Sequence, residues 1–239
     1  MKHRLYLPPP LTAGADRTLD AEQTHYLTRV LRLPRGAPFV CFDGVGSAWR
    51  ATLTAVSGKS ATIRIEECLE QLAAPIERLH LVQGILKGAA MDQVVQKATE
   101  LGATDLWLLD AARSNVAVGA ERVVRKREHW QRVIESAASQ CHQLHLPRLH
   151  GPLSLAACLG ELRDVHLLLL DPGADPLPLQ PPPGALAVLI GPEGGWSDPE
   201  RTLAVSQGAV PYGLGRLVLR AETAPLAVLA ALRHGRHWQ

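Results

Sequence analysis

The chain has 239 residues, a formal net charge of +2 and an apolar content of 46%, which suits a globular protein of one large domain or two modest ones. No segment approaches the roughly 20 consecutive apolar residues of a membrane span. Residues 1–10 also lack the apolar core of a signal peptide. We therefore expect a cytoplasmic protein with no membrane partner.

The first seventy residues combine one helix pattern with closely spaced strand patterns. A helix is expected over residues 20–31, with Asp20 as its N-cap, and it ends before the Pro-Arg-Gly turn at 34–36. Short strands are then expected at residues 38–42, 48–55 and 61–66. This pattern predicts a small β-barrel over residues 1–70, with residues 69–75 as a linker.

From Arg78 onward, strand and helix patterns alternate. Apolar strands are expected at residues 79–83, 106–109, 165–170, 185–190 and 210–214. Helices are expected at residues 90–101, 121–140, 198–207 and 222–232. Two of the strands are apolar throughout, as strands in a parallel sheet covered on both faces are. The alternation predicts an α/β domain with a parallel sheet over residues 76–239.

The four cysteines do not form a metal-binding pattern. None of them stands in a C-x-x-C pair or at another metal-ligand spacing, so we expect no metal site. In a cytoplasmic chain their thiols are expected to be reduced and to serve in packing. They are Cys41, Cys68, Cys141 and Cys158.

Three loops suggest a ligand site, because open α/β sheets bind ligands outside the carboxyl ends of their strands. The loops lie at residues 170–173, 191–197 and 214–223. The second has three glycines in five residues, which allow a ligand to approach the backbone closely. It is neither a G-x-G-x-x-G motif nor a P-loop, and Glu193 would repel a phosphate. The loop therefore favours a ligand that is neutral or cationic nearby, unless it is only a connector.

The third loop places the apolar triplet Leu217-Val218-Leu219 between two arginines. An apolar loop at a strand end suits a flat apolar ligand such as adenine, held by backbone groups. Arg220 and Glu222 would then flank the site with opposite charges. The alternative is that these two residues form an internal salt bridge where the next helix begins.

These loops carry a family resemblance. Residues 191–195 (GPEGG) and 214–224 (LGRLVLRAETA) resemble the knotted SPOUT methyltransferases. Within that class, the chain is similar to the ribosomal RNA small subunit methyltransferase E family, which makes N3-methyluridine. Further segments agree in order and spacing and extend the resemblance over nearly the whole chain: residues 25–32, 42–44, 87, 96–102, 113–114 and 135–140.

The resemblance implies a fold, a reaction and partners. The fold is α/β, with a C-terminal parallel-sheet trefoil-knot domain preceded by a small PUA-like β-barrel that binds RNA. The cofactor is S-adenosylmethionine, and the substrate is N3 of a uridine in 16S ribosomal RNA on the assembled small subunit. Because the family is dimeric, the helix at residues 222–232 is expected at a homodimer interface, unless it serves only in core packing.

The resemblance also implies which residues hold the cofactor. The backbone of Leu214, Gly215 and Leu219 would bind adenine, and Gly191 and its neighbours would border the ribose and the methionine part. The full expected set is Leu170, Gly191, Pro192, Gly194, Gly195, Leu214, Gly215, Leu217, Leu219 and Thr223.

The expected reaction is attack of uridine N3 on the sulfonium methyl group. Either a base removes the N3 proton, or cations stabilise the anion that spreads onto O2 and O4. Arg220 is the candidate for the electrostatic role. Glu193 or Glu222 is the candidate base, if held within hydrogen-bonding reach.

RNA binding is expected to be electrostatic first and specific second. Arginine offers a rigid fork of donors that suits phosphate. Two groups of arginines are candidates, unless they form only a solvated basic face. They are Arg4, Arg17, Arg29, Arg32 and Arg35 on the barrel, with Arg122 and Arg125 on the helix at 121–140.

The chain departs from the family pattern at several positions. His142-Gln143 stands where the family commonly has Gly-Arg, and charged residues that are usual near Ala89-Ala90 are absent. These departures leave the detailed RNA contacts open. Two alternatives remain at this stage: another SPOUT enzyme, acting on ribose 2′-OH, tRNA or pseudouridine, and a non-catalytic RNA-binding or assembly protein. A nucleotide-binding dehydrogenase is disfavoured, because an early G-x-G-x-x-G is missing.

Overall fold

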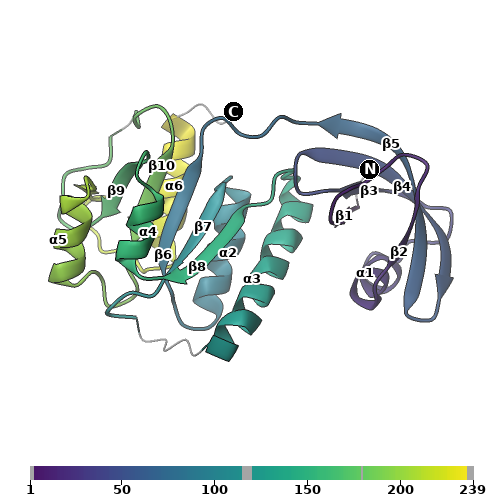
Figure 1. Cartoon of the computed structure of the whole chain (residues 1–239), viewed down its shortest axis with the longest axis horizontal. Helices are drawn as coiled ribbons and strands as arrows, with labels where there is room; N and C mark the ends of the chain where they lie inside the picture. The colour runs from purple at the N-terminus through teal and green to yellow at the C-terminus, as the bar shows by residue number, and fades with distance from the viewer. Residues whose placement is uncertain (1–2, 115–119, 179, 236–239) are drawn as a thin grey trace. The chain divides into compact units, whose positions relative to one another are not determined.

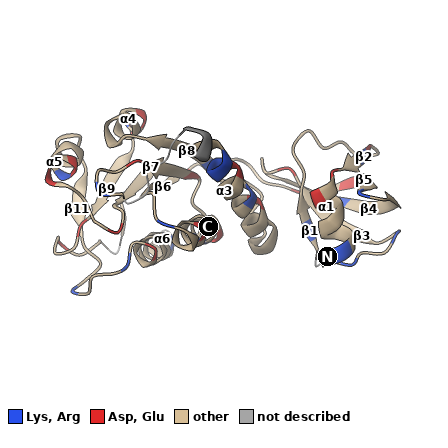
Figure 2. Ribbon diagram, turned by 90° about the horizontal axis from the view of Figure 1, so that it is seen from below, with Lys and Arg blue, Asp and Glu red and all other residues tan. Residues whose placement is uncertain are grey.

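The structure is a computed structural model that describes residues 3–114, 120–178 and 180–235. The chain divides into two compact units, one of residues 1–74 with 138–146 and one of residues 75–137 with 147–239. Figure 1 labels most of the helices and strands, and Figure 2 labels β11. The expected division into domains at residues 1–70 and 76–239 stays a prediction.

The first unit is built on a five-stranded sheet with the strand order β1-β3-β4-β5-β2. β1 pairs with β3 in parallel, and the other pairs are antiparallel. Phe39, Leu53 and Ile63 are fully buried in its core together with Leu27. The strands are β1 Arg4–Tyr6, β2 Asp16–Leu19, β3 Pro38–Phe42, β4 Ser47–Ser57 and β5 Ser60–Gln71.

The predicted helix of residues 20–31 is present in two parts. α1, Ala21–His25, begins with a capping box, in which Asp20 and Gln23 each accept a hydrogen bond from the other's backbone N–H. The chain then continues as one π-helical segment, η1, over Tyr26–Val30. Arg32 follows in the left-handed region, with a φ of 54°, and ends the helical path.

The strand patterns of this unit are only partly visible in the sequence. The three strands predicted there are confirmed as β3, β4 and β5, whereas β1 and β2 are too short, at three and four residues, to show an alternation. The expected linker at residues 69–75 is wrong at its start, because β5 runs to Gln71. The end of β5 is exposed and polar, so no burial pattern marks it as a strand.

The second unit contains a six-stranded parallel sheet with the order β11-β9-β10-β6-β7-β8. β6, β7 and β10 are buried along their whole length, because helices cover both faces of the sheet. Figure 2 shows α4 and α5 on one face and α6 on the other. The strands are β6 Leu79–Gly84, β7 Asp105–Leu109, β8 Arg148–Leu153, β9 His166–Leu170, β10 Leu186–Ile190 and β11 Val210–Tyr212.

The helices of this unit bury one apolar stripe each. α6 turns Val228, Leu229 and Leu232 into the core, at the spacing of one helix face. The helices are α2 Ala89–Glu100, α3 Ala120–Cys141, α4 Leu155–Glu161, α5 Asp198–Ser206 and α6 Thr223–Gly235.

Most elements predicted for residues 76–239 are confirmed, with ends that differ by a few residues. β8 and α4 are not predicted. β8 carries the pair Gly151-Pro152 and is only half-buried, and α4 has seven residues, so neither shows a sustained apolar period.

The last turn of α3 belongs to the first unit. It lies in a buried cluster that joins it to the barrel strands, formed by Val40, Phe42, Ala48, Ala138 and Leu144. α3 ends at Cys141, and His142 then adopts a φ of 66°. Glycine takes this left-handed conformation at the least cost. Histidine is therefore less favourable at this backbone position than glycine would be.

A buried charge network lies at the amino ends of β6, β7 and β8. Asp105 is fully buried and forms ion pairs with Arg78 at 2.7 Å and Arg148 at 3.2 Å. His150 Nε2 lies 2.9 Å from the same carboxylate. Burial alone would raise the pKa of Asp105, but hydrogen bonds from His150, Arg78 and Thr104 bring it down to about 2. The carboxylate therefore stays charged and connects the starts of three strands.

His80 lies beside this carboxylate and is itself buried. The indole Nε1 of Trp107 donates to Nδ1 of His80 at 3.1 Å, so Nδ1 carries no proton. Burial lowers the pKa of His80 to about 4, although the charge of Asp105 opposes the shift. The folded protein therefore keeps this ring neutral where an unfolded chain would protonate it.

The first prediction is a loss of stability in mild acid. Between pH values of about 6.5 and 4, the unfolded chain binds a proton at His80 that the folded chain does not, which lowers the free energy of unfolding by up to about 3 kcal/mol. His80→Asn keeps an acceptor for Trp107 and should flatten this pH dependence. Urea unfolding at a series of pH values measures it.

The control is His166→Asn, which changes an exposed histidine on β9. This variant should follow the wild-type pH dependence. An equal acid loss in wild type and His80→Asn would contradict the assignment.

Candidate active site

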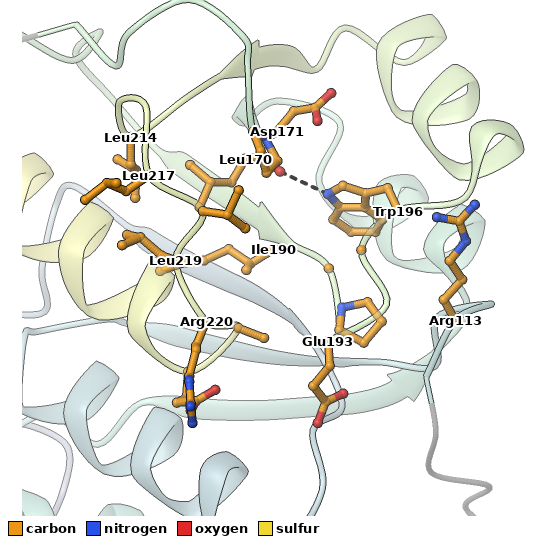
Figure 3. A pocket seen from close by; sticks show the side chains of 18 of the residues that line it. Arg113, Leu170, Asp171, Ile190, Glu193, Trp196, Leu214, Leu217, Leu219 and Arg220 are labelled. Atoms are coloured by element: carbon orange, nitrogen blue, oxygen red, sulfur yellow. Dashed lines mark hydrogen bonds and ion pairs between the residues drawn. The ribbon is translucent and has the colours of Figure 1, made fainter.

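A cavity of about 650 Å³ lies at the carboxyl ends of β9, β10 and β11. The loops that leave these three strands line it. Ala90 of α2 and Arg113, which lies after β7, also line it. Figure 3 shows the side chains around it. The three loops that the sequence singles out at strand ends therefore meet at one site, as the topology of a parallel sheet requires.

The loop after β10 is fixed by groups from other segments. Buried Gln83 donates through Nε2 to the carbonyl of Gly191 at 3.3 Å. The backbone N–H of Lys87 donates to Oε1 of Glu193 at 3.1 Å. A Cβ on Gly84 would lie 2.6 Å from the backbone nitrogen of Pro192, so the end of β6 touches this loop directly.

The loop after β9 contributes a charged pair and a carbonyl. Arg201 from α5 forms an ion pair with Asp171, with Nε 3.0 Å from Oδ2. The indole Nε1 of Trp196 donates to the carbonyl of Leu170 at 3.2 Å, drawn as a dashed line in Figure 3. These contacts join the loops after β9 and β10 on the α5 side of the cavity.

Arg113 is presented by a turn that is held on both sides. The N–H of Ala112 donates to Glu200 at 2.8 Å, and Oγ of Ser114 donates to the carbonyl of Ile85 at 2.9 Å. Burial would raise the pKa of Glu200, but hydrogen bonds from the N–H of Ala112 and from Ser197 hold it below its ordinary value. The turn is therefore tied to a charged carboxylate at the start of α5.

The loop after β11 forms the apolar end of the cavity. Leu214 and Leu219 line it with Leu170, and Gly215 takes a φ of 97° with open space at its missing side chain. Leu217 is 81% exposed, although it lies at the edge of the same cavity. Apolar surface is thus offered to a ligand rather than buried in the core.

Arg220 and Glu222 lie next to each other at the cavity. Their closest charged atoms are 3.9 Å apart, and the side chain of Arg220 is 86% exposed while that of Glu222 is 22% exposed. At such exposure an ion pair contributes little to stability. The salt bridge considered as the alternative is present, but it leaves the guanidinium of Arg220 accessible from solvent.

Most of the residues proposed for the site lie around the cavity. Arg220, Glu222 and Glu193 line it, as do Leu170, Gly191, Pro192, Gly195, Leu214, Gly215, Leu217 and Leu219. Gly194 and Thr223 do not. Gly194 instead faces Arg113, where a Cβ would lie 2.9 Å from Cβ of Arg113, and Thr223 begins α6.

Several lining residues were not singled out as site residues by the sequence. Asp171 and Pro172 stand in one of the three loops that the sequence singles out, and Arg113 stands in a segment that carries the family resemblance. The sequence therefore contains a signal for these three residues. Trp196 stands in the glycine-rich loop at residues 191–197, so it too lies in a segment that the sequence singles out. Arg201 lies in the interior of α5, where only the structure brings it to Asp171.

The arginines proposed for RNA binding on the barrel differ in their surroundings. Arg29, Arg32 and Arg35 are exposed, in η1 and the segment after it. Arg17 is half-buried and donates to the carbonyl of Pro10 at 3.2 Å. Arg4 lies over the Phe42 ring, at 5.6 Å from its centroid, and burial lowers its pKa.

The second group lies on α3, where Figure 2 shows basic residues in blue. Arg125 is exposed, whereas the side chain of Arg122 lies outside the described residues. Two further basic residues of the helix have contacts within the protein. Lys126 lies over the Trp130 ring, and Arg127 donates to the carbonyls of Leu149 and Gly151 in β8. Of these basic residues of α3, only Arg125 is exposed and has no such packing contact among the described residues.

The described part of the chain holds no group of three histidine, cysteine or carboxylate side chains arranged to bind a metal ion. Among its helices, none combines the length and the apolar character that a membrane span requires.

A parallel sheet with its cavity among these three strand-end loops is the arrangement expected of the α/β methyltransferase domain that the sequence predicts. Comparison with known proteins supports this class and gives the family. The model of an RNA methyltransferase domain matches residues 73–233, and that of an RNA methyltransferase PUA domain matches residues 19–66. The ribosomal RNA small subunit methyltransferase E of Synechocystis sp. is 34% identical, over 97% of this chain and 77% of the relative. That of Bacillus subtilis is 28% identical, over 91% and 89%.

Solved structures agree with the sequence comparison. A Legionella pneumophila methyltransferase in complex with bound S-adenosylmethionine superposes with a TM-score of 0.91, at 32% identity over 98% of both chains. A Neisseria gonorrhoeae ribosomal RNA small subunit methyltransferase E bound to S-adenosylmethionine gives 0.86, at 30% identity over 98% of both chains. The chain belongs to the ribosomal RNA small subunit methyltransferase E family, and the predicted fold class, a PUA-like domain followed by an α/β-knot domain, is confirmed.

The second prediction concerns the contact between β6 and the loop after β10. Gly84→Ala forces the backbone of Pro192 to move, so the free energy of unfolding should fall by about 1–3 kcal/mol. Gly160→Ala is the matched control, because its Cβ meets nothing within 4 Å on α4 and alanine favours a helix. Urea unfolding compares the two, and equal stability would contradict the contact.

Proposed function

We propose that this protein transfers the methyl group of S-adenosylmethionine to N3 of a uridine in 16S ribosomal RNA, with the assembled small subunit as its substrate. The observation that carries the proposal is that the three strand-end loops meet at one cavity. Family membership supports RNA methylation, and two similar solved structures hold S-adenosylmethionine. The atom N3 follows from the family resemblance.

The cavity suits S-adenosylmethionine in size and in lining. Its volume, about 650 Å³, lies within the range of roughly 300–1,000 Å³ that is usual for small-molecule sites. Leu214, Leu217 and Leu219 offer apolar contact to an adenine ring at one end. Charged and polar side chains lie toward the other end, where the amino-acid part of the molecule would extend.

The chemistry needs a nucleophile and a means of removing its proton. S-Adenosylmethionine, when bound, presents a methyl group on a positively charged sulfur. As uridine N3 loses its proton, negative charge spreads onto O2 and O4, and the accessible guanidinium of Arg220 stabilises that charge. We assign proton acceptance to Glu222, which lies beside Arg220. Glu193, the other candidate base, is engaged by the N–H of Lys87.

Binding of the ribosomal RNA is proposed to begin on the barrel. Arg29, Arg32 and Arg35 are exposed on one short stretch of chain, so they can reach phosphates without losing an internal contact. Arg125 on α3 is the second proposed contact. Arg4 and Arg17 are less suited, because each already packs or donates within the barrel.

The active form is proposed to be a cytoplasmic homodimer. α6 buries one stripe in its own core and leaves Ala227 and Ala231 exposed on the opposite side, where small side chains permit close helix packing. Leu217 and Val218 add exposed apolar surface to the neighbouring loop. A second copy of the chain is the proposed occupant of this face.

The proposed function is tested with small ribosomal subunits from cells that lack the enzyme. Labelled methyl should pass to the subunits and less well to free RNA. Because N3 methylation blocks base pairing, reverse transcriptase should stop at the labelled uridine. Label without a stop would indicate ribose methylation instead. Absence of both transfer and S-adenosylmethionine binding would indicate a non-catalytic RNA-binding protein.

Arg220→Ala separates the electrostatic role from cofactor binding. The turnover number should fall by about 100-fold or more, as when one group that stabilises a developing anion is removed. Calorimetry should find the Kd for S-adenosylmethionine within severalfold of wild type. Arg216→Ala, an exposed arginine of the same loop that does not line the cavity, is the control. Wild-type turnover in Arg220→Ala would overturn the role.

A further inference from the structure

One buried polar side chain stands directly behind the wall of the cavity. Gln83, near the carboxyl end of β6, is 1% exposed. Its neighbours in the sheet are Ile190 of β10 and Leu108 of β7, which are also buried. Ile190 lines the cavity, as Figure 3 shows, whereas Gln83 does not. The glutamine is therefore placed next to the ligand site without forming part of its surface.

The side-chain amide of Gln83 uses only its nitrogen. Nε2 donates to the carbonyl of Gly84 at 3.0 Å and to that of Gly191 at 3.3 Å. Both partners are acceptors, so the nitrogen of the amide must face them. Oε1 is buried and has no hydrogen-bond partner among the described residues. A buried acceptor without a partner is unfavourable, so an apolar side chain of similar size would suit the sheet better.

The nitrogen of Gln83 supplies a donor that the loop after β10 needs. The carbonyl of Pro192 accepts the N–H of Gly195 at 2.9 Å, so that hydrogen bond lies within the loop. The carbonyl of Gly191 instead accepts from Gln83, which belongs to the sheet. The first residue of the loop is therefore held from behind the cavity wall.

The peptide unit between Gly191 and Pro192 has two properties that make this bond necessary. Glycine adopts more backbone conformations than other residues. The nitrogen of proline carries no hydrogen, so the unit cannot be held through an N–H. Its carbonyl is thus the one polar group by which the unit can be fixed, and Gln83 keeps that carbonyl turned toward the sheet. Both residues of the unit line the cavity.

We propose that Gln83 is a positioning residue for methyl transfer, which acts by fixing the peptide unit between Gly191 and Pro192 before the ligand binds. The assignment rests on the proposed function and deepens it. Gln83 does not touch the ligand, and it gives one side of the cavity a single shape. The unpaired Oε1 makes the sheet less stable than an apolar residue would. Such a loss is expected of a residue that serves ligand binding rather than folding.

The main test is Gln83→Met, which has a similar length and cannot donate to Gly191. Binding would then have to order this residue, and ordering the backbone of one residue corresponds to about 5- to 30-fold in affinity. Calorimetry should find the Kd for S-adenosylhomocysteine weakened by that factor. Urea unfolding should find stability little changed, because the loss of two hydrogen bonds is offset by removal of the unpaired acceptor.

Kinetics with small ribosomal subunits add a readout that a purely structural role would not move. Gln83→Met should raise the KM for S-adenosylmethionine and leave the turnover number within about threefold, because a loop that is ordered once the ligand is bound supports substrate and transition state alike.

Two further variants complete the design. Gln83→Asn keeps the amide, but it is one methylene shorter and its nitrogen falls short of Gly191. It should weaken S-adenosylhomocysteine as Gln83→Met does. Thr99→Val is the control, because it removes a buried hydroxyl of α2 that bonds the carbonyl of Val95 and does not line the cavity. Its Kd should equal that of wild type.

The outcomes separate this assignment from the proposed function. A lower stability of Gln83→Met with an unchanged Kd would mean that Gln83 serves folding only. Wild-type affinity in Gln83→Asn would mean that the bond to Gly191 is not needed. Either result overturns the assignment while the methyltransferase function stands. Failure of the wild-type protein to bind S-adenosylhomocysteine and to transfer methyl would overturn the proposed function itself.

Discussion

The contact between the end of β6 and the loop after β10 is the constraint on which the cavity depends. At Gly84 the strand touches Pro192 so closely that no side chain fits, and Gln83 donates to the carbonyl of Gly191 from a buried position. Lys87 then holds Glu193 through a backbone N–H. Three successive residues of one loop are thus fixed by the end of β6 and the segment that follows it. A ligand meets a surface that is already formed, which lowers the ordering cost of binding.

The two edges of the parallel sheet serve different purposes. At the amino ends of the strands, Asp105 is buried among cations and hydrogen-bond donors, and its loss would leave those groups unpaired. At the carboxyl ends, charged groups such as Arg220 stay exposed and contribute little to stability. Stability and ligand binding are therefore placed on opposite edges, so the exposed groups at the site are free to meet ligand and RNA.

Elements with a long apolar period can be predicted from the sequence. Contacts between residues that are distant in the sequence cannot. α2, α3 and the buried strands can be predicted from the local apolar pattern. The three loops can be placed at one site from the sequence, because ligands of open α/β sheets bind outside the carboxyl ends of the strands. β8 and α4 are too short or too polar to show a period. The pairing of Arg201 with Asp171 depends on how α5 packs, which no local pattern encodes. The knot follows from the family resemblance alone, because physical rules of connection argue against knots.

The departures from the family pattern have two different physical effects, one on the backbone and one on the charge around the cavity. His142 occupies a left-handed backbone position that glycine fills at lower cost, so this difference acts through the end of α3. Ala90 lies on the cavity itself, near positions where charged residues are usual in the family, and it offers only a methyl group. The charge on that side of the cavity must then come from other segments. Arg113 and Glu193 line the cavity, and the close approach of Arg113 depends on Gly194, where a Cβ would lie 2.9 Å from Cβ of Arg113.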